Sequence, residues 1–224
     1  TGGNGSIRPK DSIVGNKVTI GRAGGADVLD LNSCAVYGAK GQSGDTVANN
    51  EVWINSGKMG SVNGGIISAD LGTVTNNKVY ISGRPTFAAD SVIYGGYSAS
   101  GGEVSGNILN IKSTGITVSN IKNFDVYNFY LPDTVQAGDV LLTVTSGSSN
   151  EQTDLKGSSV NVGITGSAPA LKSGDNVTLL HNANGILADG TIVYGKMTQG
   201  VSLEYDFTTV LQNGDSLVTT ITVS

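Results

Sequence analysis

Few residues of this chain have a type and spacing that suit catalysis or ligand binding, and Ser216 lies in the most specific motif among them. The run Gly214-Asp-Ser-Leu217 matches a sequence motif found around the nucleophilic serine of some esterases. A nucleophilic serine needs a base, yet the one histidine, His181, precedes it and only seven residues follow Leu217. Asn-Gly-Asp before an alternating run is typical of a turn that leads into a strand. We therefore predict a strand start at Ser216 and no catalytic residue.

A second pattern suggests phosphate chemistry. Residues 190–197 are close to the phosphate-binding loop pattern, but Met197 stands where that pattern has a hydroxyl ligand for Mg²⁺. The residues that follow are typical of turn and strand, so the helix N-terminus that would hold a phosphate is missing. One histidine and one cysteine, Cys34, cannot complete a zinc site. We predict a buried Cys34, a surface His181, no metal site and no cofactor.

Carboxylates are the remaining candidates for catalysis. Enzymes that cleave acidic polysaccharides on parallel β-helices use clustered carboxylates, either with calcium or as acid–base pairs. The acidic residues of the first half are Asp45, Glu51, Asp70, Asp90 and Glu103. They occupy different positions of the repeat described below, so they need not share a face. Most are expected to be solvated turn residues, and an enzyme assembled from separate coils stays open as an alternative.

The composition excludes several classes of partner. Hydrophobic residues make up 38% and charged residues 14% of the 224 residues, with 33 glycines and 4 prolines, which is typical of a folded chain rich in turns. A formal net charge of −5 offers no basic surface, so we predict no nucleic-acid partner. Apolar runs stay well below the roughly 18 residues of a membrane span, so the chain is not expected to be embedded in a membrane.

The elements that must position these residues come from an internal repeat. Four segments share a β-branched residue, a polar turn, an asparagine and then two apolar residues two positions apart. The segments are residues 13–20, 47–54, 74–81 and 104–111. Two apolar residues with this spacing lie on one face of a strand, and the residue between them points to the other face. Runs at 35–38, 65–68 and 91–96 predict a second strand that ends in small residues at a sharp bend.

A repeat of this size buries its apolar face only by stacking on its neighbours. No apolar set with helical spacing persists for three turns. The sequence therefore predicts an all-β fold, a right-handed parallel β-helix, or solenoid. Equivalent residues of successive coils would then lie about 4.8 Å apart in columns.

One column is predicted to be a structural ladder of amide side chains, bonded along the stack as in cross-β assemblies. Its members are Asn16, Asn50, Asn77 and Asn107. The next column begins Lys17, Glu51 and Lys78, which alternate in sign as an exposed column in parallel register should. Unconnected hairpin turns are the alternative explanation of the asparagines.

The C-terminal half differs from the repeats. From about residue 121 the asparagine pattern fades, and four aromatic residues fall within 124–130. Strand-like runs separated by Gly-Asp and Asp-Gly turns continue to the C-terminus. A solenoid needs a cap, because its last coil exposes strand edges and apolar side chains. We predict repeat coils over 1–120 and a C-terminal cap over 121–224, continuous with the solenoid.

The repeats, together with residues 123–132, 134–139 and 166–180, resemble the passenger domains of Gram-negative autotransporter adhesins. The C-terminal stretch resembles the part of the passenger just before the outer-membrane barrel. The resemblance implies that the chain is a segment of a longer protein, exported to the bacterial cell surface or released, and tethered through a C-terminal barrel outside this segment. It also implies an autochaperone-like role for 121–224. The scarcity of cysteine fits export through a pore.

The expected function is therefore a non-enzymatic, structural and adhesive module on the bacterial surface. Trp53 and Tyr80 lie on the outward face of their strands and are the candidate contacts with a host or bacterial surface protein or glycan. A polysaccharide-active β-helix enzyme and a ligand-free spacer are the alternatives. Three or more carboxylates within about 6 Å in a cleft would favour the enzyme, and exposed aromatics in a flat groove would favour adhesion.

Overall fold

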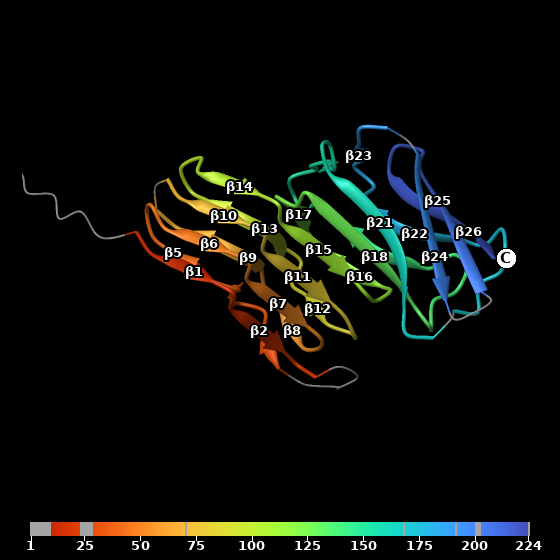
Figure 1. Ribbon diagram of the computed structural model, residues 1–224, viewed down its shortest axis with the longest axis horizontal. Coiled ribbons are helices and arrows are strands. Elements are labelled where there is room, and N and C mark those ends of the chain that lie inside the picture. Colours follow the sequence, from red (N-terminus) through yellow and green to blue (C-terminus); the bar gives the residue numbers. More distant parts are fainter. Residues whose placement is uncertain are drawn as a thin grey trace, which may run out of the picture.

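The coils of this protein stack along the long axis of the molecule (Figure 1). The computed structural model describes residues 10–22, 29–69, 71–167, 169–190, 192–199 and 203–223, with the backbone alone at 192–199 and 203. The described residues form strands and turns and no helix, and thus no helix that could cross a membrane. Most strands pair in parallel with the equivalent strand of the next coil. The predicted all-β parallel solenoid is confirmed.

The longest parallel sheet, sheet B, runs through six coils. Its strands in spatial order are β2 (Lys17–Ile20), β7 (Glu51–Ile54), β11 (Lys78–Ile81), β15 (Ile108–Ile111), β18 (Val126–Pro132) and β21 (Ser159–Thr165). Val79 and Ile81 of β11 are fully buried while Tyr80 between them is partly exposed, and β7 and β18 alternate in the same way. This alternation fixes the register, because a slip of one residue would turn the apolar set outward.

Two further parallel sheets and a short one complete the coils. Sheet A consists of β1 (Ser12–Val14), β6 (Thr46–Ala48), β10 (Thr73–Thr75) and β14 (Glu103–Ser105). Sheet D consists of β4 (Val36–Tyr37), β9 (Val62–Ile67), β13 (Val92–Ser98) and β17 (Asn120–Lys122), and β5 (Lys40–Gly41) also pairs with β9. Sheet C consists of β3 (Asp30–Leu31), β8 (Lys58–Met59) and β12 (Thr86–Phe87).

The corner between sheet A and sheet B has one residue per coil in the left-handed region of backbone space. These residues are Gly15, Asn49, Asn76 and Gly106, with φ of 72°, 56°, 56° and 68°. Glycine adopts this conformation without a Cβ clash, and asparagine tolerates it better than most residues. Each repeat therefore carries a Gly-Asn or Asn-Asn pair, in which the first residue makes the turn and the second belongs to the predicted ladder.

The C-terminal end changes from parallel to antiparallel pairing, seen as the blue strands in Figure 1. Sheet E runs in the order β16 (Ile116–Val118), β19 (Val140–Val144), β22 (Asn176–His181), β26 (Ser216–Val223), β25 (Leu203–Gln212) and β24 (Ile192–Gln199). A short parallel pair is formed by β20 (Thr153–Asp154) and β23 (Ile186–Leu187). The first three strands of sheet E are parallel, and β26 is the first antiparallel one.

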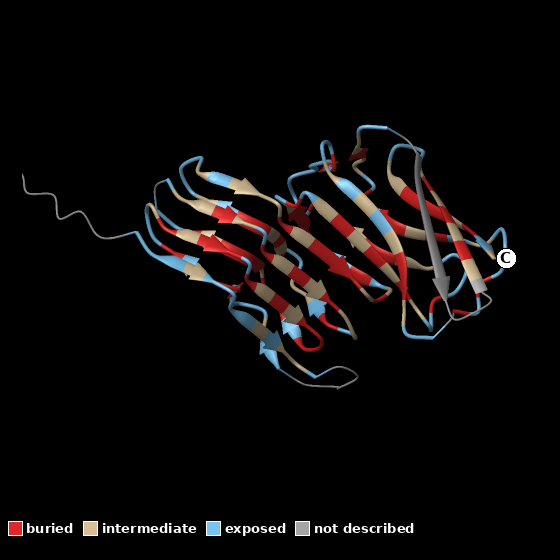
Figure 2. Cartoon of the chain, in the orientation of Figure 1, coloured by how far each residue is buried: buried red, intermediate tan, exposed pale blue. Residues whose placement is uncertain are grey.

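The apolar core follows the length of the stack, as the buried segments of Figure 2 show. Its bulkiest fully buried side chains are C-terminal: Tyr127, Phe129, Tyr205 and Phe207. A smaller apolar cluster centres on Val47 and Val74 of sheet A. Parallel pairing continues from β15 to β18 across residue 120, so the stack is uninterrupted there. The division into coils and cap at that residue stays a prediction.

Candidate functional site

The four asparagines of the predicted ladder lie in one column at the corner between sheets A and B. Each Nδ2 donates to the Oδ1 of the next member: from Asn16 to Asn50 at 2.9 Å, from Asn50 to Asn77 at 2.9 Å and from Asn77 to Asn107 at 3.1 Å. Each of these oxygens also accepts the backbone N–H of the preceding asparagine. Three of the four are fully buried, where an unmade hydrogen bond costs about 1–3 kcal/mol.

The remaining amide protons are also used. Nδ2 of Asn50 donates to the carbonyl of Ile13 at 3.1 Å, and Nδ2 of Asn77 donates to the carbonyl of Val47 at 3.3 Å. The ladder ends at Asp125, whose Oδ2 accepts the backbone N–H of Asn107 at 3.2 Å. Sequence analysis missed Asp125, because the residues before it depart from the repeat. The hydrogen-bonding capacity of the two central amides is filled, which makes this column a structural element.

A pair of glycines in sheet D, Gly64 and Gly65, packs against the ladder residue Asn77. A Cβ on Gly64 would lie 2.4 Å from the carbonyl oxygen of Gly95 and 3.0 Å from the Cβ of Asn77. A Cβ on Gly65 would lie 2.9 Å from the Nδ2 of Asn77. Contacts this short would displace the amide. Gly95 and Gly96, which end the run 91–96 and were predicted to permit a bend, pack in the same way against Asn107. The glycine pairs of sheet D are therefore part of the packing of the ladder.

The outward residues of sheet B form a second column, called here the outer column. Its members in coil order are Thr19, Trp53, Tyr80, Asn110, Asn128 and Asn161. Trp53 and Tyr80 stack with ring centroids 3.8 Å apart and 10° between the ring planes, and both are partly exposed. The structure thus places the two predicted contact residues side by side on the surface of the solenoid.

Lysines cover the faces of these rings. The Nζ of Lys17 lies 4.6 Å from the centre of the Trp53 ring. The Nζ of Lys112 lies 5.3 Å from Trp53, 5.4 Å from Tyr80 and 5.3 Å from Tyr130. These cation–π contacts and the stacking occupy the ring faces, so the rings present edges and polar groups to solvent. The outer column suits a partner that contacts ring edges and hydrogen-bonding groups.

Amides continue the outer column toward the C-terminus. Nδ2 of Asn128 donates to Oδ1 of Asn110 at 2.9 Å, and Nδ2 of Asn161 donates to Oδ1 of Asn128 at 2.9 Å. This second asparagine ladder was not predicted. Its signal in the sequence is an asparagine at the outward position of three successive strands. After Thr19, the outer column therefore has two aromatic and three amide side chains.

The charged column beside it has the predicted register, with Lys17 opposite Glu51 and Glu51 opposite Lys78. The Nζ of Lys78 lies 3.9 Å from Oε1 of Glu51, and Nε1 of Trp53 donates to Oε2 of Glu51 at 3.0 Å. Burial, and then the negative charge of Glu51, raise the pKa of Tyr80. The Tyr80 hydroxyl therefore stays protonated at neutral pH and can donate a hydrogen bond to a partner.

The described acidic residues among the five catalytic candidates of the sequence lie on separate elements. Asp45 is 2% exposed, and its carboxylate accepts two backbone N–H groups. Glu51 lies on sheet B and Glu103 on sheet A. Asp90 is exposed in a turn, and Asp70 lies outside the described residues. Within the part of the chain that the structure describes, no group of three His, Cys, Asp or Glu side chains could hold a metal ion.

The structure does bring His181 and Ser216 together, which the sequence did not reveal. They are paired across β22 and β26, and Nδ1 of His181 lies 2.9 Å from Oγ of Ser216. The Ser216 hydroxyl donates its one proton to Oδ1 of Asp215 at 2.7 Å, so it accepts from the imidazole. A serine nucleophile needs the reverse arrangement, in which the hydroxyl donates to histidine and the carboxylate orients the imidazole. These contacts fit a residue that fixes the register of β26 against β22 better than they fit a nucleophilic serine.

Asp215 belongs to a turn that recurs along the chain. In each copy a glycine at positive φ precedes an aspartate, the aspartate N–H bonds to the carbonyl three residues earlier, and a strand follows at once. The copies are residues 42–45, 136–139, 172–175 and 212–215. The Gly-Asp-Ser sequence thus has a folding explanation, and the predicted strand start at Ser216 is confirmed.

Two further expectations can be compared with the structure. The pattern that is close to a phosphate-binding loop falls on β24, which is a strand, and Thr191 lies outside the described residues. The prediction of a buried Cys34 was wrong, because Cys34 is exposed just after β3, where its N–H closes a turn onto Leu31 at 2.9 Å.

The described residues thus form a regular stack of coils with a buried ladder, an outer ladder and one aromatic pair. Comparisons of the chain with protein families, with curated proteins and with solved structures found no match.

Proposed function

We propose that this chain is a structural and adhesive β-solenoid module of an autotransporter-type protein on the bacterial surface. It contacts a host or bacterial surface protein or glycan through the outer column. The observation that carries the proposal is this column itself, which sets Trp53 and Tyr80 in line with three amide side chains along a single sheet of six strands. Tryptophan and tyrosine, together with arginine, are enriched among the residues that contribute most of the binding energy at protein interfaces.

The backbone under the outer column supports this role. The buried ladder and the glycines packed against it hold the coils in register, so the spacing of the outward side chains is set before a partner arrives. A preorganised surface loses less conformational entropy on binding than a flexible one. The bacterial surface location is supported by the resemblance of the repeats and of residues 166–180 to autotransporter passengers.

The two alternatives have less support. A polysaccharide-active enzyme needs converging carboxylates. Of the acidic residues that the sequence singles out, Glu51 and Glu103 lie on different sheets, and the Asp45 carboxylate is held by backbone N–H groups. A ligand-free spacer needs only the inward-facing residues that stack the coils. The stacked aromatic pair on the outer face therefore favours a binding role over a purely structural one.

The test is a double variant built from residues that the outer column already contains, Trp53→Thr and Tyr80→Asn. Thr19 and Asn110 occupy the same column in neighbouring coils, so the variant should fold, with a loss of about 0.5–1.5 kcal/mol from the aromatic pair. Adhesion of protein-coated beads to bacterial and host-cell surfaces should fall at least about tenfold, because truncating an aromatic residue at the energetic centre of an interface costs about 2 kcal/mol or more.

Tyr97→Asn is the matched control, since Tyr97 is 39% exposed on sheet D, away from the outer column. Beads coated with this variant should adhere as the wild type does. Equal adhesion of the double variant and the wild type, or an equal loss in the control, would contradict a role for the outer column.

A further inference from the structure

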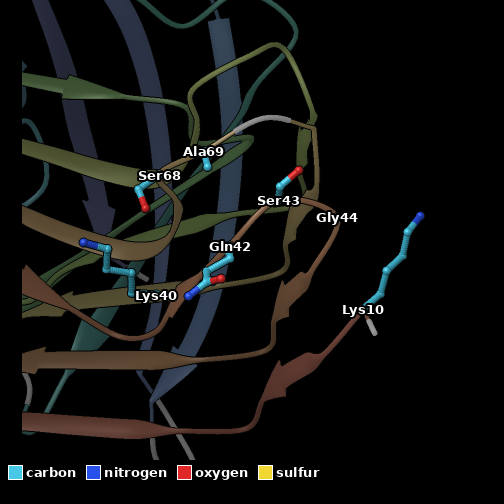
Figure 3. Close-up of a pocket in the computed structure, with 8 residues that line it drawn as sticks. Lys10, Lys40, Gln42, Ser43, Gly44, Ser68 and Ala69 are labelled. Atoms are coloured by element: carbon cyan, nitrogen blue, oxygen red, sulfur yellow. The ribbon is translucent and has the colours of Figure 1, made fainter. Parts of the chain in front are cut away.

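A hollow of about 900 Å³ lies among the N-terminal coils, apart from the outer column. It is lined by Lys10, by residues 40–44, which comprise β5 and the three residues after it, and by residues 68–69, which follow β9. Figure 3 shows Lys40 and Ser68 on one side of it and Lys10 on the other. Its size is within the range of about 300–1,000 Å³ that is typical of ligand sites.

The described residues that line the hollow carry charge opposite in sign to that of the chain. They have two ammonium groups and no carboxylate, whereas the chain has a formal net charge of −5. Neither Lys10 nor Lys40 forms an ion pair with another described residue, and the Nζ of Lys40 lies 5.8 Å from the ring of Tyr37. Both lysines are exposed, so their charges are available to an anionic ligand.

Neutral hydrogen-bonding groups lie between the lysines. The Gln42 amide and the hydroxyls of Ser43 and Ser68 are exposed in the lining. Asp45 stabilises the turn that carries Gln42 and Ser43. Its Oδ2 accepts the Gln42 N–H at 2.7 Å, and its own N–H donates to the Gln42 carbonyl at 3.1 Å. Because this carboxylate is buried, it orders the turn without lining the hollow.

We infer that the hollow binds an acidic glycan, meaning an oligosaccharide that carries carboxylates on its sugar rings. The lysines match the carboxylates, and the amide and hydroxyl groups match the ring hydroxyls. The described lining residues include Ala69 but no aromatic ring, so we expect recognition to depend on charge and hydrogen bonds. This inference rests on the proposed adhesive function and names a ligand class and a second contact site for it.

The test uses the whole chain and an oligogalacturonate of about five sugar units, with calorimetry as the readout. Saturable binding is expected, and it should weaken with added salt, because exposed charges are screened over about 8–10 Å at physiological ionic strength. The double variant Lys10→Gln and Lys40→Gln should bind about tenfold more weakly, since each exposed charge pair contributes up to about 1 kcal/mol. Lys58→Gln is the control, because Lys58 is exposed, pairs with Asp30 at 3.7 Å and lies on sheet C.

Two further probes separate glycan recognition from simple charge attraction. A neutral malto-oligosaccharide of the same length should not bind, and inorganic phosphate should compete only weakly. Equal binding of the wild type and the lysine variant, equal binding of the neutral sugar, or full competition by phosphate at equal concentration would overturn the inference. An absence of oligogalacturonate binding would also overturn it. If the Trp53/Tyr80 variant still loses adhesion in that case, the proposed function stands without this site.

Discussion

Replacing Asn77 by Asp is expected to lower the free energy of unfolding by about 3–5 kcal/mol, the range for an uncompensated charge in a protein interior. Asn77 is fully buried, and its Nδ2 donates to Asn107 at 3.1 Å and to the Val47 carbonyl at 3.3 Å. In the variant a carboxylate oxygen would face these two acceptors instead of a donor. Urea denaturation followed by circular dichroism measures the change.

Asn49→Asp is the matched control, because it makes the same chemical change one coil away on an exposed side chain. Asn49 has a φ of 56°, which aspartate also tolerates, so the shift should stay within about 0.5 kcal/mol, as for most surface substitutions. Similar shifts for the two variants would show that the ladder does not contribute to stability.

Removal of the antiparallel strands is expected to have a larger effect. A chain that ends at Gly190 lacks β24, β25 and β26 and, with them, the buried side chains of Tyr205, Phe207, Leu217 and Ile221. At about 1.5–3 kcal/mol for each buried side chain of this size, the loss is about 6–12 kcal/mol, close to the whole stability of a typical domain. The shortened chain should expose apolar surface, bind a hydrophobic dye and unfold without a cooperative transition.

Deletion of residues 1–44 is the control at the other end of the stack. It removes β1 to β5, whose side chains are mostly exposed or half-buried, and the second coil then becomes a new end of the same kind. Cooperative unfolding should persist with a lower midpoint. If the two deletions lower the midpoint equally, the antiparallel strands are not a special cap.

The sequence predicted the parts of the fold in which residues of the same chemical type recur at the same position of each repeat. An apolar pair two residues apart, preceded by asparagine, recurs four times, and this is enough to set the strands, the inward face and the register. Trp53 and Tyr80 could be placed outward for the same reason. The stacking of their rings depends on rotamers that the pattern does not specify.

Other features depend on contacts between segments with no common pattern. Asp125 ends the ladder although residues 121–125 do not follow the repeat, and His181 meets Ser216 only because β26 runs antiparallel to β22. The hollow with Lys10 and Lys40 combines three turns from different coils. Cys34 was misassigned because it lies in the turn between β3, which ends at Leu31, and β4, and a small apolar residue gives no local sign that it belongs to an exposed turn.

The central claim, that the chain binds surfaces and does not process them, is tested most directly by one incubation with two readouts. Wild-type chain is mixed with an acidic polysaccharide fixed to beads, with uncoated beads as the blank. The amount of chain retained and the length of the sugar chains are then measured over time by gel filtration after chemical release. We expect saturable retention with unchanged sugar lengths. Progressive shortening of the sugar chains would contradict the claim and identify an enzyme.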